Sequence, residues 1–243
     1  MVENSFRSKN YAAFTEAAAR ICPHRVFTDY LLRYAYGIDA SCYSYLPEVV
    51  VKANSESEII QLVKLAQKLE TPVSFRAAGS SLSGQASCES ILIVANDGFK
   101  KAEVLENGNA LRVECGVIGS DANDMLAPFG KKIGPDPATI TTALVGGIIN
   151  NNSSGMCCGT AQNSYKTIRS LRVVLLDGSV VDTGDPQSIN TFLTDKKAIV
   201  DQLTELREDI LGDSELVDLI QRKYKIKNTT GYSINSLVDF EDI

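Results

Sequence analysis

The sequence of 243 residues contains no tryptophan and only one histidine, His24. His24 follows Pro23 in an N-terminal region that we expect to be helical, so we interpret it as a surface or capping residue. Serine–histidine–aspartate catalysis therefore has no support, and no group of histidine, cysteine and carboxylate residues has the spacing of a metal site. We predict no metal and assign no catalytic residue in this chain.

Paired cysteines in a C-x-x-C arrangement are also absent, although the sequence has six cysteines. Cys157 and Cys158 are adjacent, which suits neither a normal disulfide nor tetrahedral zinc. We interpret the cysteines as reduced thiols, most of them buried as small hydrophobic side chains. Reduced thiols predict a cytoplasmic protein.

Strong positive charge and long hydrophobic runs are missing as well. The net charge is −6 and no basic run exceeds two residues, which argues against a nucleic-acid partner. Apolar stretches such as 143–149 are too short for a transmembrane segment, and the N-terminus lacks the apolar region of a signal peptide. The content of 44% hydrophobic and 22% charged residues is typical of a globular chain with one large or two small domains.

The stretch from Pro72 to Gln85 begins as a strand and continues as a run of small residues. Val73 and Phe75 alternate with polar residues, and then only Leu82 interrupts a series of Ala, Gly, Ser and Gln. Gly79 and Gly84 can adopt positive φ, which lets consecutive N–H groups form a concavity for a phosphate or pyrophosphate. A Ser/Gly-rich surface loop is the other interpretation, and composition alone does not decide between them.

Two common nucleotide fingerprints do not fit this loop. Gly79 and Gly84 have the spacing of a P-loop, but Gln85 and Ala86 stand where lysine and serine or threonine are needed. The sequence contains no G-x-G-x-x-G, which disfavours a Rossmann NAD site. A nucleotide bound by this loop would therefore be of another kind.

A second informative stretch runs from Gly134 to Gly155. Pro135 and Pro137 fix an extended or turning backbone, and the Gly146-Gly147 pair permits a close approach. Residues 152–155, Asn-Ser-Ser-Gly, supply short donors and acceptors. Together these features predict a loop that wraps a flat ligand, with an irregular glycine-rich turn as the alternative.

Hydrophobic periodicity predicts alternating helices and strands around these two stretches. Within residues 9–36, which we expect to be helical, Phe27, Leu31 and Tyr34 predict a face packed on the core, and Asp29 is a candidate cap. Asn54-Ser55 supplies a cap for the helix that follows the first strand. We expect helices at about 56–70, 119–129, 189–207 and 214–224, strands at 48–52, 73–75 and 91–94, hairpins at 102–114 and 168–181, and a loop at 228–232.

In order and spacing, these stretches resemble the vanillyl-alcohol-oxidase/PCMH-type FAD-binding domain. Residues 75–85 resemble its pyrophosphate loop. Pro135-Asp136-Pro137, Gly146-Gly147 and Asn152–Gly155 resemble its second flavin-contacting segment. Residues 153–160 and 227–232 favour the branch of the D-lactate dehydrogenases and related D-2-hydroxy acid dehydrogenases.

The resemblance implies an α+β, two-lobed FAD-binding domain at 41–243, preceded by a helical extension at 1–40. The lobes are expected at about 41–98 and 99–243. FAD is expected to be noncovalent, because the first loop has no histidine or cysteine at the position where flavinylated members attach it. The implied cofactor-binding residues are Arg76, Ala77, Ala78, Gly79, Ser80, Ser81, Gly84, Gln85, Pro135, Asp136, Thr142, Gly146, Gly147, Asn152, Ser153, Ser154 and Gly155.

The roles of two of these residues are open, and a third residue differs from the one common in the family. Arg76 either neutralises the diphosphate or pairs with a nearby carboxylate, and we favour the second role. Gln85 either contacts the cofactor or caps the loop. Ala77 stands where many members carry glycine, a change that still permits close approach.

The resemblance further implies oxidation of a D-2-hydroxy acid such as D-lactate, with FAD accepting a hydride. A quinone, cytochrome, iron–sulfur protein or flavoprotein would then accept the electrons. In this family the domain continues into a substrate-binding cap that supplies the substrate arginines and the base. We therefore expect this chain to be an inactive N-terminal part of a longer enzyme.

Other outcomes stay open. The chain could serve as the FAD domain of a glycolate oxidase subunit, of an enzyme resembling alkyl-glycerone-phosphate synthase or of a sugar-lactone oxidase. It could also be a non-catalytic nucleotide-binding module. Related enzymes associate peripherally with membranes. Attachment to the inner face of the membrane is therefore an alternative to a cytoplasmic location, although the sequence shows no basic amphipathic helix that would support it.

Overall fold

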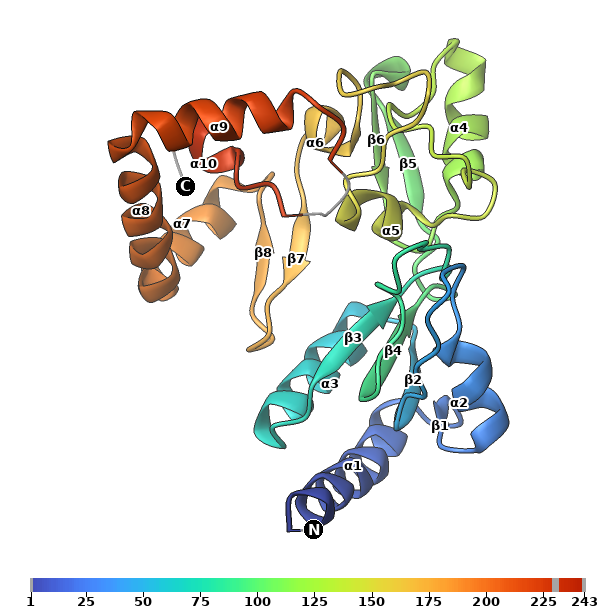
Figure 1. The fold of residues 1–243 in the computed structure, drawn as a ribbon. Helices are drawn as coiled ribbons and strands as arrows, with labels where there is room; N and C mark the ends of the chain where they lie inside the picture. Colours follow the sequence, from blue (N-terminus) through green and yellow to red (C-terminus); the bar gives the residue numbers. More distant parts are fainter. Residues whose placement is uncertain (1, 229–231, 242–243) are drawn as a thin grey trace. The chain divides into compact units, whose positions relative to one another are not determined.

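The computed structural model describes residues 2–228 and 232–241 (Figure 1). The chain forms two compact units. The first comprises Met1–Ile133, Thr139–Ile148 and Val174–Ser179, and the second comprises Gly134–Ala138, Ile149–Val173 and Val180–Ile243. Part of the loop expected at 228–232, residues 229–231, lies outside the described residues.

The first unit is built on a four-stranded sheet with the order β1-β2-β4-β3. β2 (Val49–Ala53), β4 (Ile91–Ala95) and β3 (Val73–Arg76) are parallel, and β1 (Val26–Phe27) pairs antiparallel with β2. Parallel strands are covered on both faces, which explains why the sequences of β2 and β4 read as unbroken apolar runs. Because parallel strands end at one edge, the small-residue loop after β3 starts beside the ends of β2 and β4.

Helices supply the side chains that cover the sheet. α1 (Val2–Ile21) and α3 (Glu56–Lys68) bury Phe14 and Leu62 against one face. On the other face, Val50 and Leu92 are buried against partly buried neighbours that include Tyr36 of α2 (Tyr30–Gly37). Burial of each large aliphatic side chain contributes about 1.5–3 kcal/mol, so this sheet is the main source of stability in the unit.

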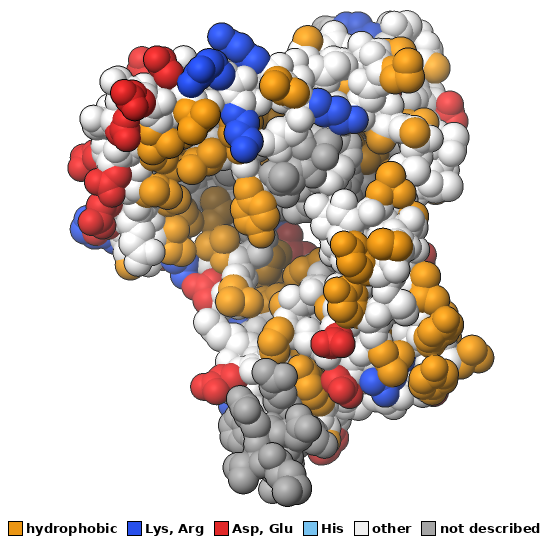
Figure 2. Space-filling view, viewed as in Figure 1, with side chains coloured by type: hydrophobic (Ala, Val, Ile, Leu, Met, Phe, Trp, Pro, Cys, Tyr) orange, Lys and Arg blue, Asp and Glu red, His pale blue; other side chains and the backbone are white. Residues whose placement is uncertain are grey.

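The N-terminal region is less uniformly helical than predicted, because β1 separates α1 from α2. Asp29 caps α2 as expected, accepting a hydrogen bond from the Leu32 amide. The predicted core face was wrong for Leu31, which is 73% exposed. Figure 2 shows hydrophobic side chains gathered over α2, where the rings of Tyr30 and Tyr34 stack with centroids 6.0 Å apart. The residues of α2 that face the core are instead Tyr36 and Gly37, which do not belong to the face predicted from Phe27, Leu31 and Tyr34.

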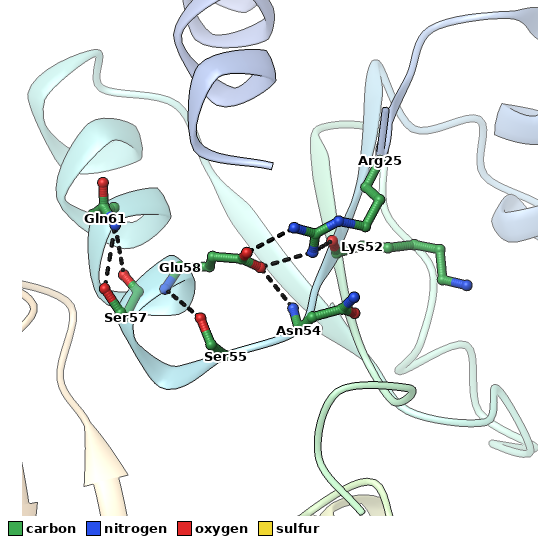
Figure 3. A network of polar contacts seen from close by, with 7 residues as sticks. All are labelled: Arg25, Lys52, Asn54, Ser55, Ser57, Glu58 and Gln61. Atoms are coloured by element: carbon green, nitrogen blue, oxygen red, sulfur yellow. Dashed lines mark hydrogen bonds and ion pairs between the residues drawn. The ribbon is translucent and has the colours of Figure 1, made fainter. Parts of the chain in front are cut away.

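Glu58 joins the start of α3 to the N-terminal segment (Figure 3). Ser55 caps the helix by accepting from the Glu58 amide, which confirms the predicted cap. The Glu58 carboxylate accepts hydrogen bonds from the Asn54 amide at 2.7 Å and from both terminal nitrogens of Arg25 at 2.8 and 2.7 Å. Arg25 also donates to the Lys52 carbonyl. Hydrogen bonding from Arg25 is the main reason why the pKa of Glu58 falls to about 2.

The rest of the first unit follows the predicted order. β5 (Ala102–Leu105) and β6 (Ala110–Val113) form the expected hairpin around the short turn η1 (Glu106–Gly108). α4 (Gly119–Leu126) and η2 (Ala127–Phe129) end at Gly130, whose φ is +67°. The stretch at 134–155 is not a continuous loop as predicted. It contains the short helix α5 (Val145–Asn150), whose Val145 and Ile148 are buried.

The second unit is mainly helical. It contains α6 (Ser164–Thr167), most of the hairpin of β7 (Arg172–Val174) and β8 (Val180–Asp182), α9 (Ser214–Tyr224) and α10 (Ser236–Asp239). The single helix predicted at 189–207 is instead α7 (Pro186–Asp195) followed by α8 (Lys197–Gly212). Lys196 interrupts the helix with φ −110° and ψ 30°. Within the ranges that the structure describes, no helix is both long enough and apolar enough to cross a membrane.

Candidate functional site

The loop after β3 has the backbone that its glycines predicted. Gly79 and Gly84 both adopt φ +76°, a conformation that glycine adopts without strain. The segment after α2 lies against this loop, with the Ala40 amide donating to the Gly79 carbonyl at 3.1 Å. A Cβ atom at Gly84 would lie 2.9 Å from the Tyr43 ring, so no side chain fits there. The sequence did not reveal these neighbours, because no local pattern links residues 36–43 to the loop.

The loop exposes a series of unused amide groups. The five consecutive amides from Ala78 to Leu82 donate no hydrogen bond to any residue that the structure describes. The five residues that carry these amides are partly or fully exposed. Consecutive N–H groups around a residue with positive φ form a concavity that binds anions.

Ser81 organises the second half of the loop. Its hydroxyl oxygen accepts hydrogen bonds from the amides of Ser83 at 3.1 Å and Gln85 at 3.3 Å. The same hydroxyl donates to the Gln85 side-chain oxygen at 3.0 Å. The Gln85 side chain therefore caps the loop, which is one of the two roles considered for it. The Ser81 hydroxyl forms its hydrogen bonds within the loop.

Arg76 lies at the base of the loop with its guanidinium group against Gly79. One nitrogen donates to the Tyr36 carbonyl at 3.0 Å, and the guanidinium carbon lies 5.9 Å from the centre of the Tyr36 ring. Burial lowers the pKa of Arg76, and the nearby Asp39 and Tyr36 oppose this effect. No described carboxylate is within ion-pair distance of Arg76, so its charge is not neutralised by a salt bridge.

The start of α5 lies against the base of the same loop. The Gly146 amide donates to the Cys115 carbonyl at 2.9 Å, and a Cβ atom at Gly146 would lie only 2.7 Å from that of Cys115. A Cβ atom at Gly147 would lie 3.4 Å from the Ala77 methyl group. The first unit thus brings the predicted glycine pair next to the predicted pyrophosphate loop. Thr142 lies in an exposed turn, where its hydroxyl donates to the Thr139 carbonyl.

In the second unit, Asp136 and Gly155 are in direct contact. The Asp136 carboxylate accepts hydrogen bonds from the amides of Cys157 and Cys158, both at 3.1 Å. Hydrogen bonding from Cys158, and then from Cys157, lowers the pKa of Asp136 to about 2. Pro135 beside it is buried.

The residues from Asn152 to Ser154 are buried in the second unit. Asn152 has φ +45° and bridges two segments, because its oxygen accepts from the Tyr165 amide and its nitrogen donates to the Asn228 carbonyl. The Ser153 carbonyl accepts from the Ser164 amide. The Ser154 hydroxyl is buried and has no hydrogen-bond partner among the residues that the structure describes. A buried hydroxyl without a partner is costly unless a ligand supplies one.

The predicted site residues therefore fall into two groups. Arg76 to Gln85, Thr142, Gly146 and Gly147 belong to the first unit, whereas Pro135, Asp136 and Asn152 to Gly155 belong to the second. Among the described residues, no group of histidine, cysteine and carboxylate side chains could hold a metal ion. The expectation that most cysteines are buried was wrong: only Cys22 and Cys158 are buried, and Cys42 and Cys157 are exposed.

The sequence matches a family model described as FAD binding domain over residues 47–184, more than half of the chain. The chain belongs to this family of FAD-binding domains. The match confirms the resemblance to PCMH-type domains and identifies the cofactor as FAD, for which noncovalent binding is typical of the family.

The relatives that the chain matches include two hydroxy acid dehydrogenases. D-2-hydroxyglutarate dehydrogenase of Escherichia coli (strain K12) is 31% identical over 160 residues, which cover 64% of this chain and 16% of that protein. D-lactate dehydrogenase of Archaeoglobus fulgidus is 30% identical over 140 residues, or 56% of this chain and 31% of the relative. The FAD-binding domain thus spans only about a sixth to a third of these two proteins.

Solved structures confirm the α+β fold of a vanillyl-alcohol-oxidase-like FAD domain. A structure of alkyldihydroxyacetonephosphate synthase superposes with a TM-score of 0.59 at 19% identity, covering 72% of this chain and 35% of that one. The BBE-like 1 protein of Physcomitrella patens superposes with a TM-score of 0.60 at 17% identity, covering 70% and 37%. At these identities the likeness concerns the fold alone.

The chemistry of the site residues fits FAD. The open amides of residues 78–82 and the unpaired charge of Arg76 suit a diphosphate. The buried, unpartnered Ser154 hydroxyl suits a polar edge of a flavin. The described residues thus offer donor groups suited to the diphosphate and to the flavin of FAD.

Proposed function

We propose that the FAD-binding domain holds the diphosphate of FAD with the loop from Arg76 to Gln85 and the flavin with Gly146, Gly147 and residues 152–155. The observation that carries this proposal is the run of five open amides beside the unpaired guanidinium group of Arg76. Charge-assisted and backbone hydrogen bonds are the usual means of holding a diphosphate. Gly79 is essential to this arrangement, since any side chain there would meet the Arg76 guanidinium group.

The reaction that we propose for the whole protein is oxidation of a D-2-hydroxy acid such as D-lactate or D-2-hydroxyglutarate. Bound FAD would supply the hydride acceptor. This chain would bind and orient the cofactor. We assign no base to it, because none of the predicted site residues is suited to remove a proton from a substrate hydroxyl. We therefore expect no turnover of a 2-hydroxy acid by this chain alone.

A glycolate oxidase subunit is the second candidate. The subunit GlcD of Escherichia coli (strain K12) is 21% identical over 206 residues, and this match covers 82% of the chain and 41% of the subunit. The larger share of the chain that this match covers favours a glycolate oxidase subunit over the dehydrogenases, whereas its lower sequence identity disfavours it. Assays of the natural gene product with D-2-hydroxyglutarate, D-lactate and glycolate, each with several electron acceptors, would distinguish the candidates. Activity with none of the three acids, in a protein with bound flavin, would contradict both.

Absorption spectroscopy of the purified chain tests cofactor binding. The proposal predicts the visible bands of oxidised flavin, and denaturation should release all of the flavin into solution because the attachment is noncovalent. A colourless chain that takes up no added FAD would refute the proposal. Flavin that stays with the denatured protein would refute noncovalent attachment.

Variants of Arg76 test the assignment of the loop. Arg76→Ala should weaken FAD binding about tenfold or more, because a charge-assisted contact is lost. Arg76→Lys keeps the charge but not the planar fork, so its effect should be smaller. Arg33→Ala is the control, since Arg33 pairs with Glu48 and the Pro47 carbonyl. If Arg76→Ala binds FAD as well as Arg33→Ala does, Arg76 serves only to anchor Tyr36.

A further inference from the structure

We propose that Asp136 is a positioning residue, whose carboxylate holds the turn at Gly155–Cys158 and thereby fixes the Ser154 hydroxyl for the flavin without contacting FAD. This inference rests on the proposed function and deepens it. It also changes the role of Asp136, which the sequence predicted to bind the cofactor directly.

Both carboxylate oxygens of Asp136 are occupied by the turn. Oδ2 accepts from the Cys157 amide and Oδ1 from the Cys158 amide, each at 3.1 Å. Two adjacent amides that point at one carboxylate form a bidentate contact, which fixes orientation as well as distance. A carboxylate engaged in this way is turned toward its own chain, so it is poorly placed to bind a ligand.

The backbones of the two segments also touch. A Cβ atom at Gly155 would lie 1.9 Å from the Asp136 carbonyl oxygen and 2.2 Å from Oδ1. Only glycine can therefore occupy position 155. Pro135 and Pro137 limit the backbone freedom of Asp136 from both sides, which lowers the entropic cost of holding it in place.

Cys158 strengthens the turn from within. Its sulfur accepts a hydrogen bond from the Gly155 amide at 3.0 Å and contacts the Gly159 carbonyl at 3.4 Å. Gly159 has φ +52°, which lets the chain leave the turn. The thiol therefore has a structural role here, although its neighbour Cys157 is exposed.

Both sequence neighbours of Ser154 are held in place by other residues of the second unit. On its N-terminal side, the Ser153 carbonyl accepts from both the amide and the hydroxyl of Ser164. On its C-terminal side, Gly155 packs on Asp136. Ser154 itself is only 5% exposed, and its hydroxyl has no partner in the described part of the chain. Since the structure fixes both neighbours of a buried, unused hydroxyl, we infer that the turn exists to present this group to the flavin.

A double-mutant cycle on FAD affinity tests the inference. Asp136→Ala should weaken FAD binding about tenfold, and Ser154→Ala about fivefold. If Asp136 acts through Ser154, the double variant should bind within about twofold of Asp136→Ala, because the second change removes nothing further. Effects that multiply would show that Asp136 contributes independently and would overturn the inference. Asp209→Ala, an exposed acidic residue on α8, is the control and should bind FAD normally.

Asp136→Asn keeps the inference testable if Asp136→Ala fails to fold. Asparagine keeps one acceptor oxygen for one of the two amides, so its FAD affinity should lie between those of the wild type and Asp136→Ala. If Asp136→Asn keeps the Cys157 and Cys158 amides protected from exchange and yet binds FAD as weakly as Asp136→Ala does, the negative charge itself is required, which would contradict the positioning role.

Hydrogen exchange of the cofactor-free chain provides a readout that does not depend on FAD. The amides of Cys157 and Cys158 should be protected in the wild type and exchange faster in Asp136→Asn. Rapid exchange in the wild type would refute the turn itself. Protected amides in a wild-type chain that binds no FAD would instead refute the proposed function, and with it the purpose assigned to the turn.

Discussion

Gly147 lies against Ala77, so that a Cβ atom at Gly147 would be 3.4 Å from the Ala77 methyl group. These two residues are far apart in the sequence, and each belongs to one of the two stretches predicted to hold the cofactor. Their contact shows that the first turn of α5 packs on the base of the loop that follows β3. The neighbouring Gly146 faces Cys115 instead, so the two positions differ in how well they accommodate an added side chain.

Alanine substitutions at the two glycines should therefore have unequal effects on stability. At Gly146 the new methyl group would lie 2.7 Å from the Cys115 side chain. Such overpacking costs about 1–3 kcal/mol. At Gly147 the contact is ordinary, and alanine favours the helix by up to about 1 kcal/mol. Urea unfolding of both variants measures the difference, and equal stabilities would contradict the packing described for α5.

The Glu58–Arg25 pair predicts a specific pH dependence of stability. The pKa of Glu58 falls from 4.5 to about 2 in the folded chain, mainly because Arg25 hydrogen-bonds to the ionised form. The carboxylate therefore stabilises the fold fully above about pH 4.5, and this contribution is lost as the pH falls through about 2. It amounts to at most about 3 kcal/mol, reduced by the partial exposure of both side chains.

The variant Glu58→Gln isolates this contribution. Its free energy of unfolding should be lower than that of the wild type at neutral pH, and the two should converge as the pH falls from about 4.5 to 2. Glu16→Gln is the matched control, because Glu16 forms an exposed ion pair with Arg20 within α1. A difference between Glu58→Gln and the wild type that stays constant with pH would refute the role of the ionised carboxylate.

Ser81 and Ser83 of the loop should contribute differently to FAD affinity. Ser81→Ala removes a hydroxyl that bonds the amides of Ser83 and Gln85 and the Gln85 side chain. We expect about a three- to tenfold loss of FAD affinity, because the closed loop is no longer preorganised. Ser83→Ala should change little, since its hydroxyl has no partner among the described residues. FAD titrations compare them, and equal losses would place the Ser83 hydroxyl on the cofactor.

Thiol reactivity should follow the exposure of the cysteines. Cys42 and Cys157 are exposed and should react rapidly with an aromatic disulfide reagent in the native chain. Cys22 and Cys158 are buried and should react only on unfolding. Burial is also the main reason why the pKa of Cys22 rises to about 11, which disfavours its thiolate. Fast labelling of Cys22 or Cys158 in the native chain, located by peptide mapping, would contradict these placements.

The sequence was sufficient to predict the elements whose signals are local. The strands at 48–52, 73–75 and 91–94, the Ser55 cap and the positive φ of Gly79 and Gly84 all follow from residue type and period. Helix α5 was missed, because its two glycines disfavour a helix and only the packing of Val145 and Ile148 stabilises it. Leu31 was misplaced because periodicity cannot reveal which face of a helix meets the sheet.

The details of the candidate site depend on contacts between distant segments. The sequence indicated that Asp136 matters but not that its carboxylate binds the amides of Cys157 and Cys158. Nor did it indicate that Arg76 contacts Tyr36, 40 residues away. Such contacts arise from tertiary folding, so motifs identified the segments of the site without giving the role of each side chain.

Titration of FAD into the variants Gly79→Ala and Gly130→Ala tests the central claim most directly. Both glycines have positive φ, at +76° and +67°, so both alanine variants carry similar backbone strain. A Cβ atom at Gly79 would meet the Arg76 guanidinium group at 2.1 Å, whereas one at Gly130 would meet nothing within 4 Å. Gly79→Ala should lose at least about tenfold in FAD affinity, and Gly130→Ala should bind FAD like the wild type. Equal affinities in the two variants would contradict the assignment of this loop to the diphosphate.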